Sequence, residues 1–292
     1  MATPRITGPP FPLAVRFNLS GSSVPLRQRA GPDDHNTCTT TRRNHHREHN
    51  RHRRSRPRNG FGHRPHLRRQ GVQRRLIARN STKLDSLVTT LAEDGITAVG
   101  YAADIVDDDA LRGALDSAAT HFGGIDVLEF SPVGTPETTP LASPADSTRS
   151  DVQREIDIQL YGAMTAAHAV LPAMRAAGTG TLLFTTGAGS IDPVPIVGNV
   201  NAAAALLRNW TIGLHKELAD TGIQVAHVAI DIALGGSVLH PDAPSASPDQ
   251  VAPLYWDLHS TKRDVAEYIY SSEETNPQTF SSERYTQPAR VR

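Results

Sequence analysis

The chain has 292 residues, with 30 Lys and Arg balanced by 30 Asp and Glu, 38% hydrophobic residues and a single cysteine, Cys38. One cysteine excludes a secreted fold held together by disulfides, and no apolar run approaches the roughly 20 residues that cross a bilayer. We therefore expect a cytoplasmic protein that does not span a membrane.

The neutral net charge hides two unlike segments. Residues 1–75 carry 17 Lys and Arg against 3 Asp and Glu, a charge of +14, and seven of the 13 histidines. Residues 76–292 carry 13 Lys and Arg against 27 Asp and Glu, a charge of −14. A split of this kind predicts two segments of different character, joined near residue 75.

The basic segment, residues 1–75, shows neither helical nor strand periodicity. Its stretch 42–75 holds 13 Arg and 6 His against one acidic residue, Glu48, and so little apolar surface cannot offset the entropy of ordering a chain. We expect the segment to be a disordered basic tail, an arm that binds nucleic acid, or the product of a shifted reading frame. The nucleic-acid arm is the least favoured, because no aromatic side chains are interleaved with the arginines.

From Leu76 the sequence takes on the pattern of an α/β domain. Short apolar runs predict strands, in chain order, at 76–78, 97–102, 125–130, 181–186 and 224–230. Apolar residues at helical spacing predict helices at 81–94, 107–122, 151–177, 202–219 and 251–270. A loop rich in Pro, Ser and Thr is predicted at 133–150, and a disordered tail at 271–292. Strands that alternate with long helices predict a doubly wound parallel sheet in three layers.

Five runs of sequence carry a resemblance when they are taken together. In chain order they are LIARNSTKLDSL, AADIVDDDAL, FGGIDVLEFSP, AVLPAMRAAGTGTLLFTT and AHVAIDIALG. In this order and spacing they resemble the short-chain dehydrogenase/reductase family over about residues 76–235. The resemblance implies a Rossmann-like domain, here residues 76–270, that uses a nicotinamide dinucleotide to interconvert a carbonyl and an alcohol.

The family's first strand and glycine-rich turn are missing from the sequence as written. Residues 58–75 read RNGFGHRPHLRRQGVQRR, and GC-rich synonymous codons read one base later permit GTGSGIGRTFGAKGFNVA. That reading restores a turn of the family's pattern at the right distance from the second strand. We therefore predict that residues up to about 75 are a frame-shifted translation of the first βα unit, which sequencing the gene across codon 75 tests. In the present frame, Gly60 and Gly62 follow no predicted strand and are a weak signal of phosphate binding.

The family's catalytic Tyr and Lys, spaced as YxxxK, fall on Val200 and Ala204. Its Ser falls on Gly187 and its helical Asn on Gln159. Because neither Val nor Ala exchanges a proton, we expect the family's usual catalysis to be absent, and the catalytic residues stay unassigned.

Other polar residues lie near the same strand end. They are Thr186, Ser190, Asn199 and Asn201, with His227 in the next strand. Hydroxyl groups orient a carbonyl well but are poor proton donors without a base. We favour turn and helix-cap roles for the first four and a place in the core for His227.

Cofactor contacts are better preserved than catalytic ones. Arg79 follows the second strand, where a basic residue receives the 2′-phosphate of NADP, and Asp104-Ile105 resembles the pair that frames the adenine. We predict NADP rather than NAD, bound by Arg79, Asn80, Asp104 and Ile105, and no metal. Without the glycine-rich turn the pyrophosphate loses its cradle, so we expect weak or no binding by this chain and NADP binding by a frame-corrected version.

The residues therefore favour a short-chain dehydrogenase/reductase-like oxidoreductase of a small carbonyl or alcohol, without the usual Tyr and Lys. A non-catalytic nucleotide-binding sensor is the open alternative, and a nucleic-acid-binding protein is less favoured. The resemblance also implies a homo-oligomer formed through the helices near 151–177 and 199–221.

Overall fold

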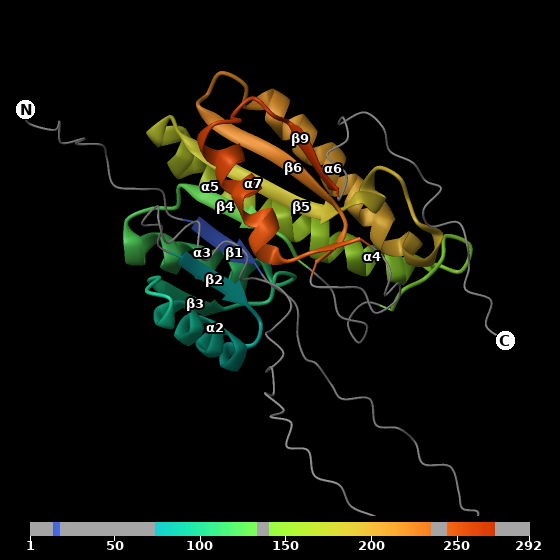
Figure 1. The fold of residues 1–292 in the computed structure, drawn as a ribbon, viewed down its shortest axis with the longest axis horizontal. Helices are drawn as coiled ribbons and strands as arrows, with labels where there is room; N and C mark the ends of the chain where they lie inside the picture. The colour runs from blue at the N-terminus through green and yellow to red at the C-terminus, as the bar shows by residue number, and fades with distance from the viewer. Residues whose placement is uncertain (1–13, 18–73, 133–139, 235–243, 272–292) are drawn as a thin grey trace, which may run out of the picture.

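Figure 1 shows the computed structural model, which describes residues 14–17, 74–132, 140–234 and 244–271. Its helices are α2 (Ser81–Glu93), α3 (Asp108–Phe122), α4 (Arg149–Ile156), α5 (Gly162–Ala177), α6 (Gly198–Glu217) and α7 (Pro248–Ser260). Its longer strands are β1 (Ala14–Phe17), β2 (Arg74–Ala78), β3 (Ala98–Ala102), β4 (Val127–Phe130), β5 (Gly180–Gly187), β6 (Ile223–Asp231) and β9 (Glu267–Ser271). The short strands β7 (Ala233–Leu234) and β8 (Ser245–Ala246) pair with each other.

The seven longer strands form one parallel sheet in the order β3-β2-β1-β4-β5-β6-β9. Helices α3, α5 and α6 cover one face of the sheet, while α2 and α7 cover the other. This is the doubly wound, three-layered α/β architecture that the alternation of elements predicts, and the predicted fold class is confirmed.

Strand β1 lies at the centre of the sheet, where it pairs with β2 on one side and β4 on the other. We predicted no strand in residues 1–75 and a missing first βα unit, and for this strand that prediction is wrong. The four residues AVRF are too short to show a period, but an empty place between β2 and β4 would leave backbone N–H and C=O groups of both strands unpaired. The turn and helix expected after the first strand fall in residues 18–73, outside the described part of the chain.

Strand β2 begins at Arg74, two residues inside the segment that we assigned to the basic leader. Arg74 is 4% exposed and Arg75 is fully buried. The boundary of the folded domain therefore does not fall at residue 76 as we predicted, because the sheet takes both arginines into its interior.

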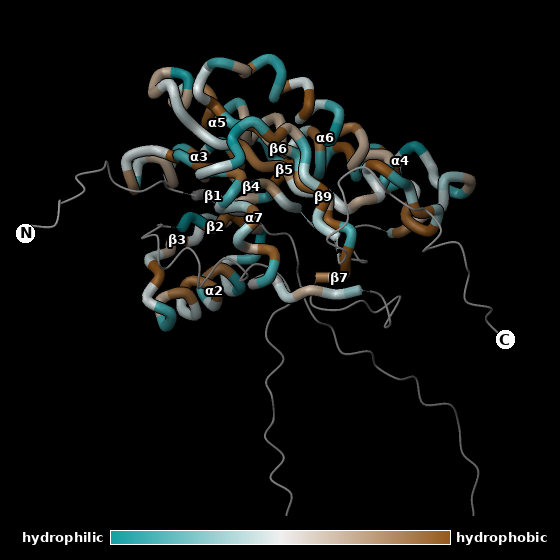
Figure 2. Tube along the Cα trace, turned by 45° about the horizontal axis from the view of Figure 1, so that its top comes forward, coloured by the Kyte–Doolittle hydropathy of each residue, from teal (hydrophilic) through white to brown (hydrophobic). Residues whose placement is uncertain are grey.

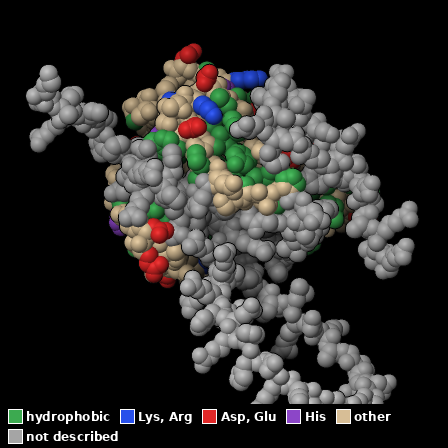
Figure 3. All heavy atoms as spheres, in the orientation of Figure 1, with side chains coloured by type: hydrophobic (Ala, Val, Ile, Leu, Met, Phe, Trp, Pro, Cys, Tyr) green, Lys and Arg blue, Asp and Glu red, His purple; other side chains and the backbone are tan. Residues whose placement is uncertain are grey.

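Most of the apolar side chains that the periodicity marks lie in the core. Figure 2, which colours the chain trace by hydropathy, shows hydrophobic stretches along the strands of the sheet and on the helices beside it. On the α3, α5 and α6 side the core is built around Phe130 and Phe184, and on the other side α7 places Leu254 and Leu258 against the sheet. In the space-filling view, hydrophobic side chains gather over the region of α7 (Figure 3). No helix in the described residues is long and apolar enough to cross a membrane.

Two predicted helices differ from the structure. The helix predicted at 151–177 is interrupted by a π-helical turn at Asp157–Tyr161, which separates α4 from α5. The helix predicted at 251–270 ends at Ser260, and its last residues form β9 instead. Pairing with β6 decides this, because an open sheet edge offers the Glu-Tyr-Ile-Tyr segment backbone partners that outweigh its weak helical period.

Candidate active site

All seven longer strands run in the same direction, so their carboxyl ends lie along one edge of the sheet (Figure 1). The connections reverse direction between β1 and β4, and in sheets of this kind the ligand binds outside the carboxyl ends at that reversal. The residues that follow β2, β3 and β5 are therefore the first to be considered.

Arg79 and Asp104 follow neighbouring strands and approach each other. Arg79 Nη1 lies 3.8 Å from Asp104 Oδ2, and each side chain is 39% exposed. Asp104 Oδ1 also accepts a hydrogen bond from the backbone N–H of Val106 at 3.2 Å, which fixes the turn after β3. The arrangement leaves a half-exposed guanidinium at the carboxyl end of β2, a group suited to binding a phosphate.

The other two predicted cofactor residues have structural roles in this geometry. The Asn80 side chain caps α2 by accepting a hydrogen bond from Lys83 N at 2.9 Å. Ile105 is 1% exposed and its side chain belongs to the hydrophobic core. The structure thus brings Arg79 and Asp104 together, while Asn80 holds the start of α2 and the Ile105 side chain lies beneath the surface.

The positions that correspond to the family's Tyr, Lys and Asn come together on α6 and the π-helical turn. Val200 is half-buried in the first turn of α6, and Ala204 is buried one turn later. Gln159 donates a hydrogen bond to the Val200 backbone oxygen at 3.4 Å and another to Glu155 Oε2 at 2.9 Å. Two of the three positions carry aliphatic side chains, which cannot donate a proton to a substrate.

The first turn of α6 packs closely against the segment that follows β5. A Cβ placed on Gly189 would lie 2.1 Å from Asn201 Oδ1, so only glycine fits there. Asn201 donates to Val194 O at 2.9 Å. Asn199 accepts from Ala142 N and donates to Pro140 O, which links α6 to the segment before α4. Both asparagines therefore shape the backbone around the strand end.

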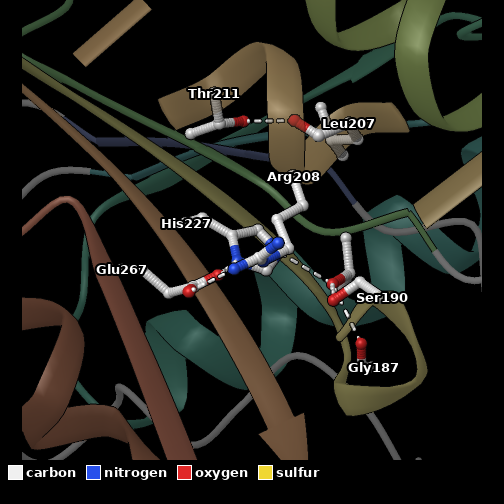
Figure 4. Close-up of polar contacts among 8 residues, drawn as sticks. Gly187, Ser190, Leu207, Arg208, Thr211, His227 and Glu267 are labelled. Carbon is white, nitrogen blue, oxygen red and sulfur yellow. Dashed lines mark hydrogen bonds and ion pairs between the residues drawn. The ribbon is translucent and has the colours of Figure 1, made fainter. Parts of the chain in front are cut away.

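A chain of polar side chains runs from this strand end into the interior (Figure 4). Thr186 Oγ1 donates to Ser190 Oγ at 3.0 Å and contacts His227 Nε2 at 2.8 Å. His227 Nδ1 lies 2.9 Å from Glu267 Oε1, and Arg208 donates to both carboxylate oxygens of Glu267, at 2.5 and 2.8 Å. We call these five residues, from β5, the turn after it, β6, β9 and α6, the buried polar chain.

Thr186, Ser190 and His227 were considered one by one from the sequence. Arg208 and Glu267 were not found. We expected His227 in the core, and His227 is fully buried. Glu267 was not found because that residue lies in the segment predicted as helix and is 40 positions from His227. Only the pairing of β6 with β9, which sets His227 opposite Glu267, brings the two side chains together.

The Glu267 carboxylate carries the strongest electrostatic feature of the site. Burial alone raises its pKa, but hydrogen bonds from His227 and Arg208 and the positive charge of Arg208 outweigh burial and lower the pKa to about 2. The hydrogen bond to Glu267 in turn raises the pKa of Arg208. Glu267 is therefore an anion throughout the neutral range.

This depressed pKa predicts a loss of stability in acid. The Glu267 interactions stabilise the fold fully above the ordinary pKa of 4.5 and are lost as the pH falls toward the folded value of about 2. Between pH 6 and pH 2 we expect the wild-type chain to lose about 2 kcal/mol more free energy of unfolding than Glu267→Gln, which has no such carboxylate. Urea unfolding followed by tryptophan fluorescence measures both proteins, and parallel pH curves would contradict the prediction.

Comparison with known proteins decides the family. The family model of the short chain dehydrogenases matches residues 59–234. The chain belongs to the short-chain dehydrogenase family. We expected the resemblance to start at residue 76, but the match starts at residue 59. It therefore includes part of residues 1–75, for which we predict a shifted reading frame.

Curated relatives of this short-chain dehydrogenase are distant. An uncharacterized oxidoreductase of Staphylococcus aureus (strain N315) is 24% identical over 189 residues, which cover 64% of this chain and 79% of that protein. A subunit of a hydroxy(phenyl)methylsuccinyl-CoA dehydrogenase of Thauera aromatica is 27% identical over 183 residues, covering 62% of this chain and 69% of the relative.

Solved structures agree with the fold of the short-chain dehydrogenase. L-sorbose reductase from Gluconobacter frateurii, complexed with NADPH and L-sorbose, has a TM-score of 0.60 at 18% identity, covering 68% of this chain and 85% of the reductase. Alcohol dehydrogenase from Thermococcus sibiricus, complexed with 5-hydroxy-NADP, has a TM-score of 0.60 at 18% identity, covering 73% and 91%. At these identities the likeness concerns the fold.

Proposed function

We propose that this short-chain dehydrogenase binds NADPH along the carboxyl edge of its sheet and reduces a small carbonyl compound, with a proton donor other than a Tyr/Lys pair. The observation that carries the cofactor proposal is the half-exposed Arg79 guanidinium beside Asp104, at the carboxyl end of β2. A reductase and an alcohol dehydrogenase of the same fold, complexed with NADPH and 5-hydroxy-NADP respectively, support it.

The described residues fit the adenosine half of such a cofactor. Arg79 has several N–H groups in a planar fork, so it can bind a 2′-phosphate through two of them while still facing Asp104. Asn80 keeps the start of α2 in place beside it. The turn that would cradle the pyrophosphate falls in residues 18–73, outside the described part of the chain. When bound, a reduced nicotinamide supplies the hydride.

The cofactor proposal predicts a specific effect of Arg79→Gln. Loss of the charged phosphate contact, worth about 1.5–3 kcal/mol, will weaken NADPH binding about tenfold to a hundredfold and leave NADH binding nearly unchanged. Fluorescence titration measures both dissociation constants. We expect weak NADPH binding by the chain as written, with a dissociation constant above the micromolar range, and tighter binding once residues 58–75 carry the frame-restored sequence.

The matched control is Arg112→Gln, which removes an exposed positive charge from the middle of α3. It should leave both dissociation constants unchanged. Equal losses of NADPH and NADH affinity in Arg79→Gln would contradict a phosphate contact, and micromolar binding by the unaltered chain would contradict the expected damage to the cofactor site.

A second function is favoured by Val200 and Ala204. With aliphatic side chains where the family places its proton donor and the lysine that assists it, the protein could bind the dinucleotide as a sensor without turning it over. Spectrophotometry of NADPH with a panel of aldehydes and ketones separates the two functions. Consumption of NADPH supports the oxidoreductase, and binding without consumption supports the sensor.

Partners and location remain proposals. Tyr161 and Leu206, on the helices where we expect a second copy to pack, are 50% and 44% exposed, which supports a homo-oligomer. We also propose a cytoplasmic location, and a small molecule rather than nucleic acid as the substrate, as the sequence predicts.

A further inference from the structure

We propose that the buried polar chain is a proton relay in which Ser190 donates the proton that a carbonyl substrate needs. Thr186 and His227 reload Ser190, and Glu267 with Arg208 holds His227 in position. The inference rests on the proposed oxidoreductase function and supplies the proton donor that Val200 and Ala204 cannot provide.

The hydrogen bonds determine which atoms carry protons. Glu267 is ionised, so its oxygens only accept, and His227 Nδ1 must donate to Oε1 across 2.9 Å. Thr186 has one hydroxyl proton and donates it to Ser190 Oγ at 3.0 Å. Its oxygen then accepts at 2.8 Å from His227 Nε2, which must carry a proton too. In this loaded state, His227 is doubly protonated, with Nδ1 donating to Glu267 and Nε2 donating to Thr186 on the side of Ser190.

The relay ends at the carboxyl edge of the sheet. Ser190 lies in the 3-10 turn that follows β5, and its hydroxyl accepts from Thr186. Among the described residues, the structure gives Ser190 Oγ no acceptor for its own proton. The neighbouring Gly187 is exposed, and a Cβ placed on it would meet nothing within 4 Å. Ser190 itself is 6% exposed, so in the proposed relay a substrate oxygen reaches its hydroxyl from the side of the exposed Gly187.

The relay also has a resting arrangement. Thr186 can turn its hydroxyl proton to the backbone oxygen of Gly187, at 3.0 Å, instead of Ser190. When His227 has given up the proton on Nε2, that nitrogen accepts from Thr186. In the discharged chain Ser190 donates to Thr186 and Thr186 donates to Nε2, so both hydroxyls turn when the chain returns to its loaded direction, with no movement of the backbone.

The reduction balances with these residues. The carbonyl carbon gains a hydride, one hydrogen with two electrons, while the C=O π pair moves to the oxygen. That oxygen takes the proton of Ser190 Oγ, Ser190 takes the proton of Thr186, and Thr186 takes the proton of His227 Nε2. The products are the alcohol, a nicotinamide oxidised by two electrons and a neutral His227.

Few charged groups face His227 in the described residues. Glu267 on β9 contacts Nδ1, and Arg208 on α6 acts through Glu267. His215, two turns after Arg208 on α6, is engaged by the backbone oxygen of Val225 at 2.8 Å. The ion pair of Glu267 with Arg208 is therefore the main charged group beside His227.

Three threonine variants of the 292-residue chain test the relay. Thr186→Val removes the hydroxyl at nearly constant shape, and Thr186→Ser retains it. Thr211→Val is the matched control, because Thr211 is buried near the chain on α6 but bonds only its own helix, at Leu207 O (Figure 4). NADPH oxidation with aldehydes and ketones is measured above the NADPH dissociation constant of each protein. Each rate is recorded across pH, and the His227 ring nitrogens are followed by nitrogen-15 NMR.

The relay predicts that Thr186→Val lowers the rate about 10²- to 10⁴-fold, with an unchanged NADPH dissociation constant. Ser190→Ala should match it, whereas Thr186→Ser and Thr211→Val should stay within about tenfold of wild type. In the NMR spectra, only Thr186→Val should shift His227 Nε2 while leaving Nδ1 bound to Glu267.

Each contrary result has a distinct meaning. Oxidation of NADPH by Thr186→Val at the wild-type rate and pH profile would overturn the relay and leave the oxidoreductase standing. A Thr186→Ser protein that is folded, binds NADPH and is as slow as Thr186→Val would also overturn it. Failure of every version to consume bound NADPH would overturn the oxidoreductase itself, and with it the catalytic role of Ser190.

Discussion

Replacing Arg75 with leucine is expected to raise the free energy of unfolding by about 1–4 kcal/mol, although the wild-type residue belongs to the sheet. Arg75 is fully buried in β2. Its Nε donates to Ala118 O at 2.8 Å and its guanidinium lies 4.5 Å from the centre of the Phe122 ring. In the described residues, Nη1 and Nη2 have no hydrogen-bond partner.

Burial is the dominant influence on this guanidinium. It lowers the pKa of Arg75, and the nearby Tyr101 and Asp126 offset this only in part. A buried charge with incomplete hydrogen bonding destabilises a fold, and the shorter, apolar leucine removes that penalty, although it gives up the contact of the guanidinium with Phe122.

Urea and thermal unfolding measure the effect. In a domain of this size, each kcal/mol of added stability raises the melting temperature by about 2–4 °C. The control is Arg112→Leu at an exposed position on α3, which should change stability by less than about 0.5 kcal/mol. A destabilised Arg75→Leu would mean that the guanidinium makes interactions that its surroundings in β2 do not reveal.

These arginines also bear on the reading frame. The sequence permitted by reading residues 58–75 one base later ends in Val-Ala, which would occupy positions 74 and 75. Both positions are buried in a strand at the interior of the sheet, where small apolar residues belong and arginines do not. This supports the proposed frame shift, which sequencing the gene across codon 75 tests, and an uninterrupted frame in closely related loci would remove it.

The second large effect is expected from restoring the family's own proton donor. In the Thr186→Val background, Val200→Tyr with Ala204→Lys should raise the rate of NADPH oxidation about 10²-fold or more. The two positions are four residues apart on α6, so their side chains lie on one face of the helix. There the lysine lowers the pKa of the tyrosine from about 10, which allows it to exchange a proton near neutral pH.

The control for this rescue is Val200→Phe with Ala204→Lys in the same background, which restores the shape without the hydroxyl. It should stay as slow as Thr186→Val alone. Equal recovery with phenylalanine would show that packing, rather than proton transfer, limits the Thr186→Val protein.

Periodicity predicts the elements that are amphipathic in their own right. The spacing of Leu84, Leu87 and Leu91, three and then four residues apart, marks the buried face of α2, and all three are buried. The run TLLFTT marks β5, which is buried along most of its length. These elements follow from the sequence because each one's contacts with the core repeat at the period of its own backbone.

Periodicity does not predict the elements that form only by pairing with a distant strand. Strand β1 has four residues, and β9 was hidden in a segment whose apolar residues also fit a helix. Each is fixed by pairing with strands far along the chain. The candidate site follows this division, since Arg79 and Asp104 were predicted from the ends of strands, whereas the contact of His227 with Glu267 exists only through β9.

We propose that the chain binds NADPH at the carboxyl edge of its sheet and that the proton for reduction travels through Thr186 and Ser190. The most direct test is the single-turnover rate of NADPH oxidation in mixtures of water and heavy water. We predict a slower rate in heavy water and a curved dependence on the deuterium fraction, because several protons move together along the relay. A rate that does not change in heavy water would contradict the claim.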